Sequence, residues 1–113
     1  MFIGVIEAQA QTVSCDELIS YVEKNGRETS SVSSYQLINS SWLKGVKRYS
    51  IDNSNVVIAE IKRNQYSIYT RKYIFCGISN TNWRSFKYGY SNLGTSYGER
   101  FHEYIMDNKC NCY

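Results

Sequence analysis

Residues 42–62 read WLKGVKRYSIDNSNVVIAEIK and contain two strand signals on either side of a turn. The second signal, over residues 56–62, is the clearer one because β-branched Val and Ile residues fill it. The first, over residues 42–50, places Leu43, Val46 and Tyr49 among basic residues. Residues 52–55 between them, DNSN, have turn composition. A connection this short implies antiparallel pairing of the two strands.

A third strand is predicted immediately after this pair. Residues 62–65, KRNQ, form the next turn, and residues 66–75 are dominated by Tyr, Ile and Phe. Because both connections are short, the three strands are expected to form a meander in chain order, with residues 56–62 at its centre.

Two helices are predicted after the meander. Ser79 can cap a segment that carries Trp83 and Phe86 and stops near Gly89. The second helix opens at Ser96-Tyr97-Gly98-Glu99, which has the form of a capping box. One face of that helix carries three apolar residues: Phe101, Tyr104 and Ile105.

An N-terminal helix is predicted before the meander. Ser14 or Asp16 can cap it, its apolar residues follow at helical spacing, and Gly26 can end it. Residues 27–41 are rich in Ser and Thr, which favours a linker with one short extended piece at residues 35–38. The chain of 113 residues is therefore expected to be a single α+β domain: a three-stranded antiparallel meander packed with two C-terminal helices and preceded by one N-terminal helix.

The first ten residues resemble the end of a signal peptide. Residues 2–6 are largely apolar and Ala8-Gln9-Ala10 is a small-x-small cleavage site, which predicts a mature start at Gln11. On this interpretation residues 1–10 are a leader remnant and the protein is secreted or periplasmic. The alternative is a short strand over residues 2–6, in which case the protein belongs in the cytoplasm. No apolar run is long enough to span a bilayer.

Four cysteines agree with export: Cys15, Cys76, Cys110 and Cys112. An even number in a short chain, placed near both ends, predicts disulfides. Neighbouring Cys110 and Cys112 are poorly placed to bridge each other, so each is expected to pair with Cys15 or Cys76, in either combination. A zinc site is the weaker alternative because the cysteine spacing lacks two close pairs. A lipid anchor at Cys15 is a further alternative, although the residues before it fit a lipobox poorly.

Three motifs give the chain a resemblance to the KTSC domain, a small domain also found at the C-terminus of some lysyl-tRNA synthetases. They are Ser41 before the first strand, residues 73–79 (YIFCGIS), where a Tyr-rich strand runs into a Gly-apolar-turn element, and Ser96-x-Gly98-x-x-Phe101-x-x-x-Ile105. The resemblance implies a core at about residues 41–105, within a single domain of residues 11–113 that has an N-terminal helical extension. It implies no established catalytic activity, and the synthetase link suggests contact with RNA.

The expected function is that of a small exported interaction module without catalytic activity, cofactor or metal, with a protein or a polyanion as its partner. The candidate ligand-binding residues are Ser96, Gly98, Glu99, His102, Tyr69, Arg71 and Tyr73. A nucleic-acid-binding accessory domain that uses basic strand edges and exposed Tyr side chains is the alternative, although a net charge of +3 is mild for such a role. A small hydrolase that uses His102 and Glu99 is the third hypothesis, since histidine titrates near neutral pH.

Overall fold

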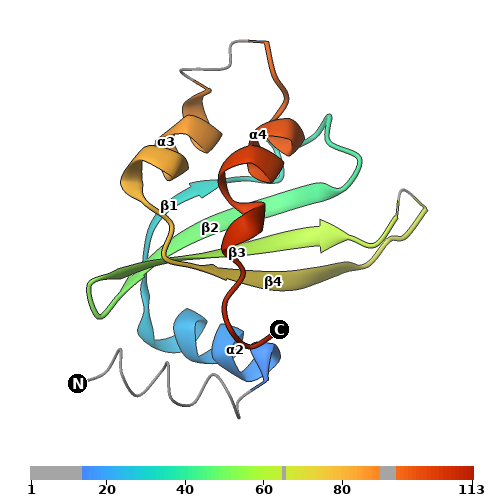
Figure 1. Ribbon diagram of the computed structural model, residues 1–113. Helices are drawn as coiled ribbons and strands as arrows, with labels where there is room; N and C mark the ends of the chain where they lie inside the picture. Colours follow the sequence, from blue (N-terminus) through green and yellow to red (C-terminus); the bar gives the residue numbers. More distant parts are fainter. Residues whose placement is uncertain (1–13, 65, 90–93) are drawn as a thin grey trace.

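The computed structural model describes residues 14–64, 66–89 and 94–113, and its α+β class is the predicted one. The elements in chain order are α2 (Cys15–Asn25), β1 (Arg27–Val32), β2 (Leu43–Ile51), β3 (Ser54–Lys62), β4 (Thr70–Cys76), α3 (Asn80–Tyr88), α4 (Tyr97–Tyr104) and the 3₁₀ helix η1 (Met106–Asn108). Helices α3 and α4 lie on one side of the sheet and α2 on the other (Figure 1).

The sheet is an antiparallel meander in the order β1-β2-β3-β4. Strand β3 lies inside the sheet, as predicted for residues 56–62. The turn between β2 and β3 is built on Asp52 and Asn53, which both have positive φ, 47° and 63°. Asp and Asn tolerate this left-handed conformation better than most residues, which explains the turn composition read from the sequence.

The prediction of three strands is wrong, because residues 27–32 form the edge strand β1 rather than part of a linker. Of its six residues only Val32 is buried, and the strand has a partner on one side only. Its pairing with β2 includes an irregularity between Glu28 and Ser30. A polar strand that is stabilised by backbone pairing to a neighbour carries no hydrophobic alternation, and β1 could therefore not be predicted from its residues alone.

Two loop segments also differ from prediction. The extended piece expected at residues 35–38 lies within a turn over residues 34–39. The third strand was expected to begin at residue 66 but begins at Thr70. Asn64 Oδ1 accepts a hydrogen bond from Tyr66 N at 2.9 Å, and Ser67 Oγ accepts one from Tyr69 N at 3.2 Å. These side-chain hydrogen bonds hold the segment in turns, where the Tyr and Ile residues had suggested a strand.

Two hydrophobic cores lie on the two faces of the sheet. The core under α3 and α4 includes Leu37, Leu43, Val46, Val57, Phe75, Trp83, Phe86, Phe101 and Ile105. The core under α2 includes Leu18, Ile19, Val22, Tyr49, Val56, Ile58 and Ile74. Because β3 contributes alternate residues to both cores, Val56, Val57, Ile58 and Ala59 are all buried. A strand covered on both faces shows such a continuous apolar run.

The C-terminal tail follows the outer edge of β4 from the α4 side to the α2 side (Figure 1). Cys110 N donates a hydrogen bond to Ile74 O at 3.3 Å, and Ile74 N donates one to Tyr113 Oη at 2.8 Å. The tail therefore satisfies backbone groups that an edge strand would otherwise leave open.

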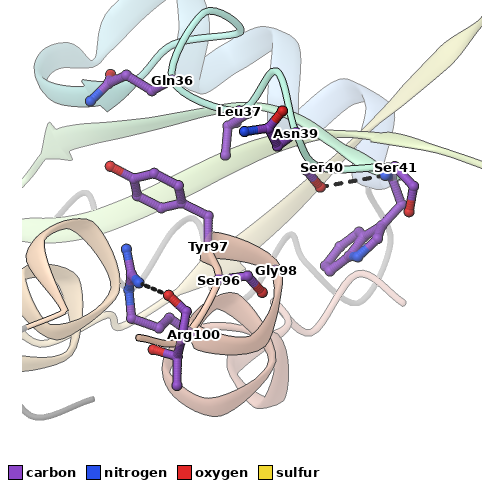
Figure 2. Close-up of a pocket in the computed structure, with 11 residues that line it drawn as sticks. Gln36, Leu37, Asn39, Ser40, Ser41, Ser96, Tyr97, Gly98 and Arg100 are labelled. Atoms are coloured by element: carbon purple, nitrogen blue, oxygen red, sulfur yellow. Dashed lines mark hydrogen bonds between the residues drawn. The ribbon is translucent and has the colours of Figure 1, made fainter. Parts of the chain in front are cut away.

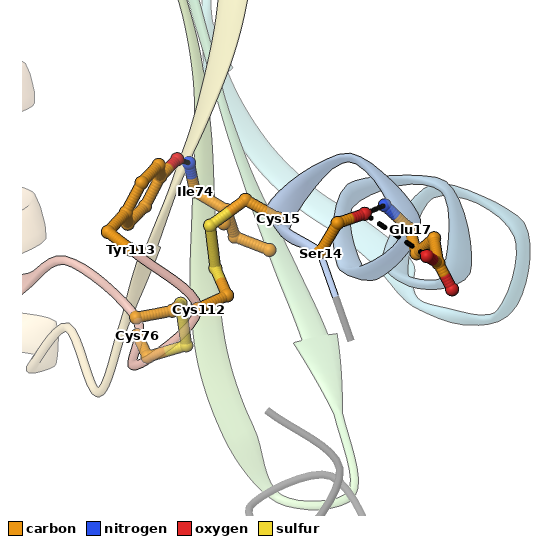
Figure 3. The surroundings of a disulfide bond; sticks show 8 residues. Ser14, Cys15, Glu17, Ile74, Cys76, Cys112 and Tyr113 are labelled. Carbon is orange, nitrogen blue, oxygen red and sulfur yellow. Dashed lines mark hydrogen bonds between the residues drawn. A yellow bond between two sulfur atoms is a disulfide. The ribbon is translucent and has the colours of Figure 1, made fainter. Parts of the chain in front are cut away.

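The tail is also held by both disulfides (Figure 3). Cys15 pairs with Cys112, and Cys76 pairs with Cys110, which selects one of the two combinations that the sequence left open. Disulfides are typical of an oxidising, extracellular environment, in line with the expected export. Helices in the described part of the chain are all too short, or too polar, to cross a membrane. The predicted leader, residues 1–10, lies outside the described residues.

Candidate functional site

A pocket of about 490 Å³ lies between the segment that precedes β2 and the start of α4 (Figure 2). The first wall consists of Gln36, Leu37 and residues 39–42, and the second of residues 95–98 and Arg100. Ser41, Ser96 and Gly98 all line this pocket. Two of the three motifs that carry the family resemblance, far apart in the sequence, thus meet at one place.

The start of α4 has the predicted capping box. Ser96 Oγ accepts a hydrogen bond from Glu99 N at 3.1 Å, and Ser96 N donates one to Glu99 Oε1 at 3.1 Å. The hydrogen bond from the Ser96 backbone lowers the pKa of the Glu99 carboxyl group, and the Ser96 side chain lowers it further. Glu99 is therefore ionised at neutral pH, and its negative charge already lies at the helix end that would attract an anion.

Gly98 allows Trp42 to lie directly against α4. A Cβ atom at position 98 would lie 3.1 Å from Trp42 Nε1 and 3.2 Å from Cζ2. The indole ring also packs edge-on against Phe101, with ring centroids 5.8 Å apart. Gly98 therefore shapes the wall of the pocket by leaving room for the aromatic ring of Trp42.

Arg100 is a buried residue of the pocket wall that is not among the predicted site residues. Its side chain is hydrogen-bonded to two backbone oxygens: Nε donates to Phe86 O at 2.7 Å and Nη1 to Thr95 O at 2.6 Å. The guanidinium carbon lies 4.6 Å from the centroid of the Tyr97 ring. In the sequence, Arg100 directly precedes the core-facing Phe101 and follows Tyr97 by three residues. This spacing was the signal that could have identified Arg100 as a residue of the pocket wall. Its contacts hold the end of α3 and the start of α4 together.

His102 is exposed, as expected for the neighbour of a core-facing residue, while Phe101 is fully buried. The imidazole ring lies beside Trp42, with ring centroids 5.1 Å apart, and does not line the pocket. Glu99 is hydrogen-bonded back to the helix start instead. Glu99 and His102, the two residues of the hydrolase hypothesis, therefore have different partners: Glu99 contacts Ser96 and His102 contacts Trp42.

The remaining candidates, Tyr69, Arg71 and Tyr73, lie at a different place, around β4. They line a smaller pocket of about 240 Å³. Arg71 lies over the ring of Tyr73 at 5.7 Å from its centroid, and Tyr73 stacks on Tyr113 at 6.2 Å between centroids. The predicted site residues are thus divided between two surfaces.

No cluster of three or more His, Cys, Asp or Glu side chains suited to a metal ion occurs among the described residues. All four cysteines are bonded in disulfides rather than available as thiolate ligands.

Comparison of the chain with known protein families, with curated proteins and with solved structures finds no match.

Proposed function

We propose that this protein is a small exported, KTSC-like binding module, and that the pocket between residues 36–42 and α4 binds an uncharged, hydroxyl-rich ligand such as a short oligosaccharide. The observation that carries the proposal is the convergence of Ser41, Ser96 and Gly98 on this pocket. Each of these residues belongs to a motif of the family resemblance.

The chemistry of the lining supports a neutral polar ligand. Amide and hydroxyl side chains from Gln36, Asn39, Ser40 and Ser41 line the pocket. The oxygens of Gln36 and Ser40 already accept backbone hydrogen bonds from Ser33 and Leu43, whereas an amide such as that of Asn39 and a hydroxyl such as that of Ser41 can each donate and accept. Trp42 and Tyr97 supply aromatic surface beside them, a combination suited to the apolar and polar sides of a sugar ring.

The electrostatics argue against an anionic ligand. The ionised Glu99 carboxylate lies at the N-terminal end of α4, and two donor groups of Arg100 are directed at backbone oxygens. Neither the helix end nor the guanidinium group is left open to a phosphate in the way that anion sites require.

The placement of the titratable groups supports a binding role rather than a catalytic one. A general acid or base works best with a pKa near the operating pH, whereas the pKa of Glu99 is shifted downward. His102 packs beside Trp42 outside the pocket.

Titration with neutral sugars tests this proposal. Maltotriose and chitotriose are the probes, inorganic phosphate is the charged comparison, and the readouts are calorimetry and the fluorescence of Trp42 in a Trp83→Phe background, because the chain has two tryptophans. We expect one of the trisaccharides to bind and phosphate not to bind. The double variant Asn39→Ala/Ser41→Ala should weaken that binding at least tenfold, because it removes two hydrogen-bonding groups from the wall.

The matched control is Ser20→Ala/Asn111→Ala, which removes the same chemical groups from exposed positions outside the pocket. Its affinity should equal that of the unmodified protein. If both trisaccharides fail to bind, or if the two double variants behave alike, the proposal is wrong.

A further inference from the structure

We infer that one end of the sheet is a docking surface for an anionic lipid membrane. In the antiparallel order β1-β2-β3-β4, the β1–β2 and β3–β4 connections emerge at the same end of the sheet. Figure 1 shows both connections extending beyond that end, on the side away from the β2–β3 turn. This inference goes beyond the proposed pocket function and rests on different side chains.

Large apolar side chains are concentrated at this end. Five of the seven exposed large hydrophobic residues in the described chain belong to the two connections: Tyr35, Ile38, Tyr66, Ile68 and Tyr69. Their exposed fractions run from 71% for Ile38 to 85% for Tyr66. Single exposed apolar residues are ordinary, whereas Tyr66, Ile68 and Tyr69 follow one another closely in the β3–β4 connection and form a local apolar group, which is typical of an interaction surface.

Local hydrogen bonds hold the β3–β4 connection in shape without using these side chains. Asn64 Oδ1 accepts from Tyr66 N, while Ser67 Oγ accepts from Tyr69 N and donates to Tyr69 O. The bonds involve backbone groups of the Tyr residues, so the aromatic rings are available for an external contact. A preorganised tip loses less conformational entropy when it binds.

The charge of the β3–β4 connection is positive. Residues 61–71 contain Lys62, Arg63 and Arg71 and no acidic residue. Glu60, the residue before this segment, accepts a hydrogen bond from Thr70 Oγ1 at 3.4 Å, so positive charges still outnumber negative ones at this end. Arg63 and Arg71 are exposed and lie, along the chain, on either side of Tyr66, Ile68 and Tyr69. Basic residues near a negatively charged membrane contribute to binding together with the buried apolar area.

The residue types favour lipid over nucleic acid. Tyr is suited to the boundary between headgroups and acyl chains, with its ring in the apolar part and its hydroxyl in water. Ile68, which lies between Tyr66 and Tyr69 in the sequence, can enter the acyl region but offers no ring for a base to stack on. Because the β3–β4 connection extends beyond the sheet, its apolar side chains can insert into a lipid surface.

Vesicle sedimentation tests the inference. The probes are vesicles of equal parts phosphatidylglycerol and phosphatidylcholine, and vesicles of phosphatidylcholine alone. We expect binding to the anionic vesicles and at least tenfold weaker binding to the neutral ones. The variant Tyr66→Ser/Ile68→Ser/Tyr69→Ser should lower the partition coefficient for anionic vesicles at least tenfold.

Two matched controls separate docking from general effects. Tyr88→Ser, on α3, should leave binding unchanged, whereas Tyr66→Ser alone should weaken it severalfold. Arg63→Gln/Arg71→Gln should weaken binding at low salt, whereas Lys24→Gln/Lys109→Gln, with the same loss of charge elsewhere, should have little effect. Circular dichroism confirms that each variant is folded.

The inference is overturned if the protein does not bind anionic vesicles, or if the triple variant binds as tightly as the unmodified protein. It is also overturned if the protein does not bind vesicles but binds a single-stranded oligothymidine with an affinity that falls steeply as salt rises, since nucleic acid is then the partner. Trisaccharide titration of the triple variant keeps the two proposals distinct, because none of its three changed residues lines the larger pocket.

Discussion

Gly98 illustrates how a single residue can serve both the fold and the candidate site. The indole ring of Trp42 lies against the position that a side chain at residue 98 would occupy. The same ring contacts Phe101 and His102. Because Trp42 packs against these two rings, it cannot move aside without disturbing the core or the pocket wall. The Ser-x-Gly signature is therefore explained by packing as well as by any contact with a ligand.

Gly98→Ala should destabilise the protein. The added methyl group meets the Trp42 ring at about the distance where crowding costs roughly 1–3 kcal/mol, more than the gain of about 0.8–1.0 kcal/mol from better helix propensity. Urea unfolding measures the difference.

Gly45→Ala is the matched control, since a Cβ atom there lies 3.9 Å from the nearest atoms of Glu60, an ordinary contact distance. It should be neutral or slightly stabilising. Equal effects of the two substitutions would mean that the approach of Trp42 does not require glycine.

At the scale of elements, helix ends were the most predictable features. The caps at Ser14, Ser79 and Ser96 and the left-handed Gly89 are each specified by one or two residues close in sequence. The apolar run of β3 was equally clear because burial on both faces allows no polar position. Strand β1 was missed because its stability comes from pairing with β2, which no local pattern records.

The candidate site was predicted only in part for a related reason. Ser96 and Gly98 were identified from the motif that opens α4, but Asn39 and Ser40 belong to a segment interpreted as a linker, and Trp42 was assigned to the start of the first strand. Their proximity to α4 depends on the tertiary arrangement. Arg100 was not predicted as a site residue because a charged residue on a helix is usually solvent-exposed.

The capping box of α4 should make its stability depend on pH. The pKa of Glu99 is lower in the folded protein than in the unfolded chain, so the carboxylate stabilises the fold at pH values above its unfolded pKa of about 4.3. That contribution disappears as the pH falls through the folded pKa.

Glu99→Gln tests this, because glutamine keeps the hydrogen-bond acceptor and removes the charge. The melting temperature of the variant should be lower than that of the unmodified protein at pH 7, and the two should converge at acid pH. Glu103→Gln, on the same helix, is the control. A difference that persists unchanged into acid would show that the charge of Glu99 is not responsible.

At the scale of the whole molecule, the tail joins two layers that have separate cores. It leaves α4 on one face of the sheet, follows β4, and reaches α2 on the other face through the Cys15–Cys112 bond. On that second face Lys72 of β4 also forms a 2.6 Å ion pair with Glu23 of α2. The hydrogen bond with Glu23 is the main cause of the raised pKa of Lys72. Helix α2 is thus attached to the rest of the protein by hydrophobic packing, by the Lys72–Glu23 ion pair and by the Cys15–Cys112 bond.

Removing the Cys15–Cys112 bond with Cys15→Ser/Cys112→Ser should lower the free energy of unfolding. The bond links positions 97 residues apart, and the loop-entropy argument gives about 4–5 kcal/mol as an upper value for a loop of this length. Denaturant unfolding measures the loss, and peptide mapping without reduction should recover the Cys76–Cys110 link. Four free thiols in freshly purified native protein would contradict the disulfide arrangement.

The Cys15–Cys112 bond has a mechanical consequence as well. It brings two positions 97 residues apart to a Cα–Cα distance of 5.1 Å and encloses every strand of the described sheet. A pulling force applied to the chain before Cys15 and after Cys112 would pass through the sulfur atoms, and the sheet between them would carry no load. Under tension the domain would behave as a short, inextensible link, until a reducing agent opened the bond and let the strands unravel.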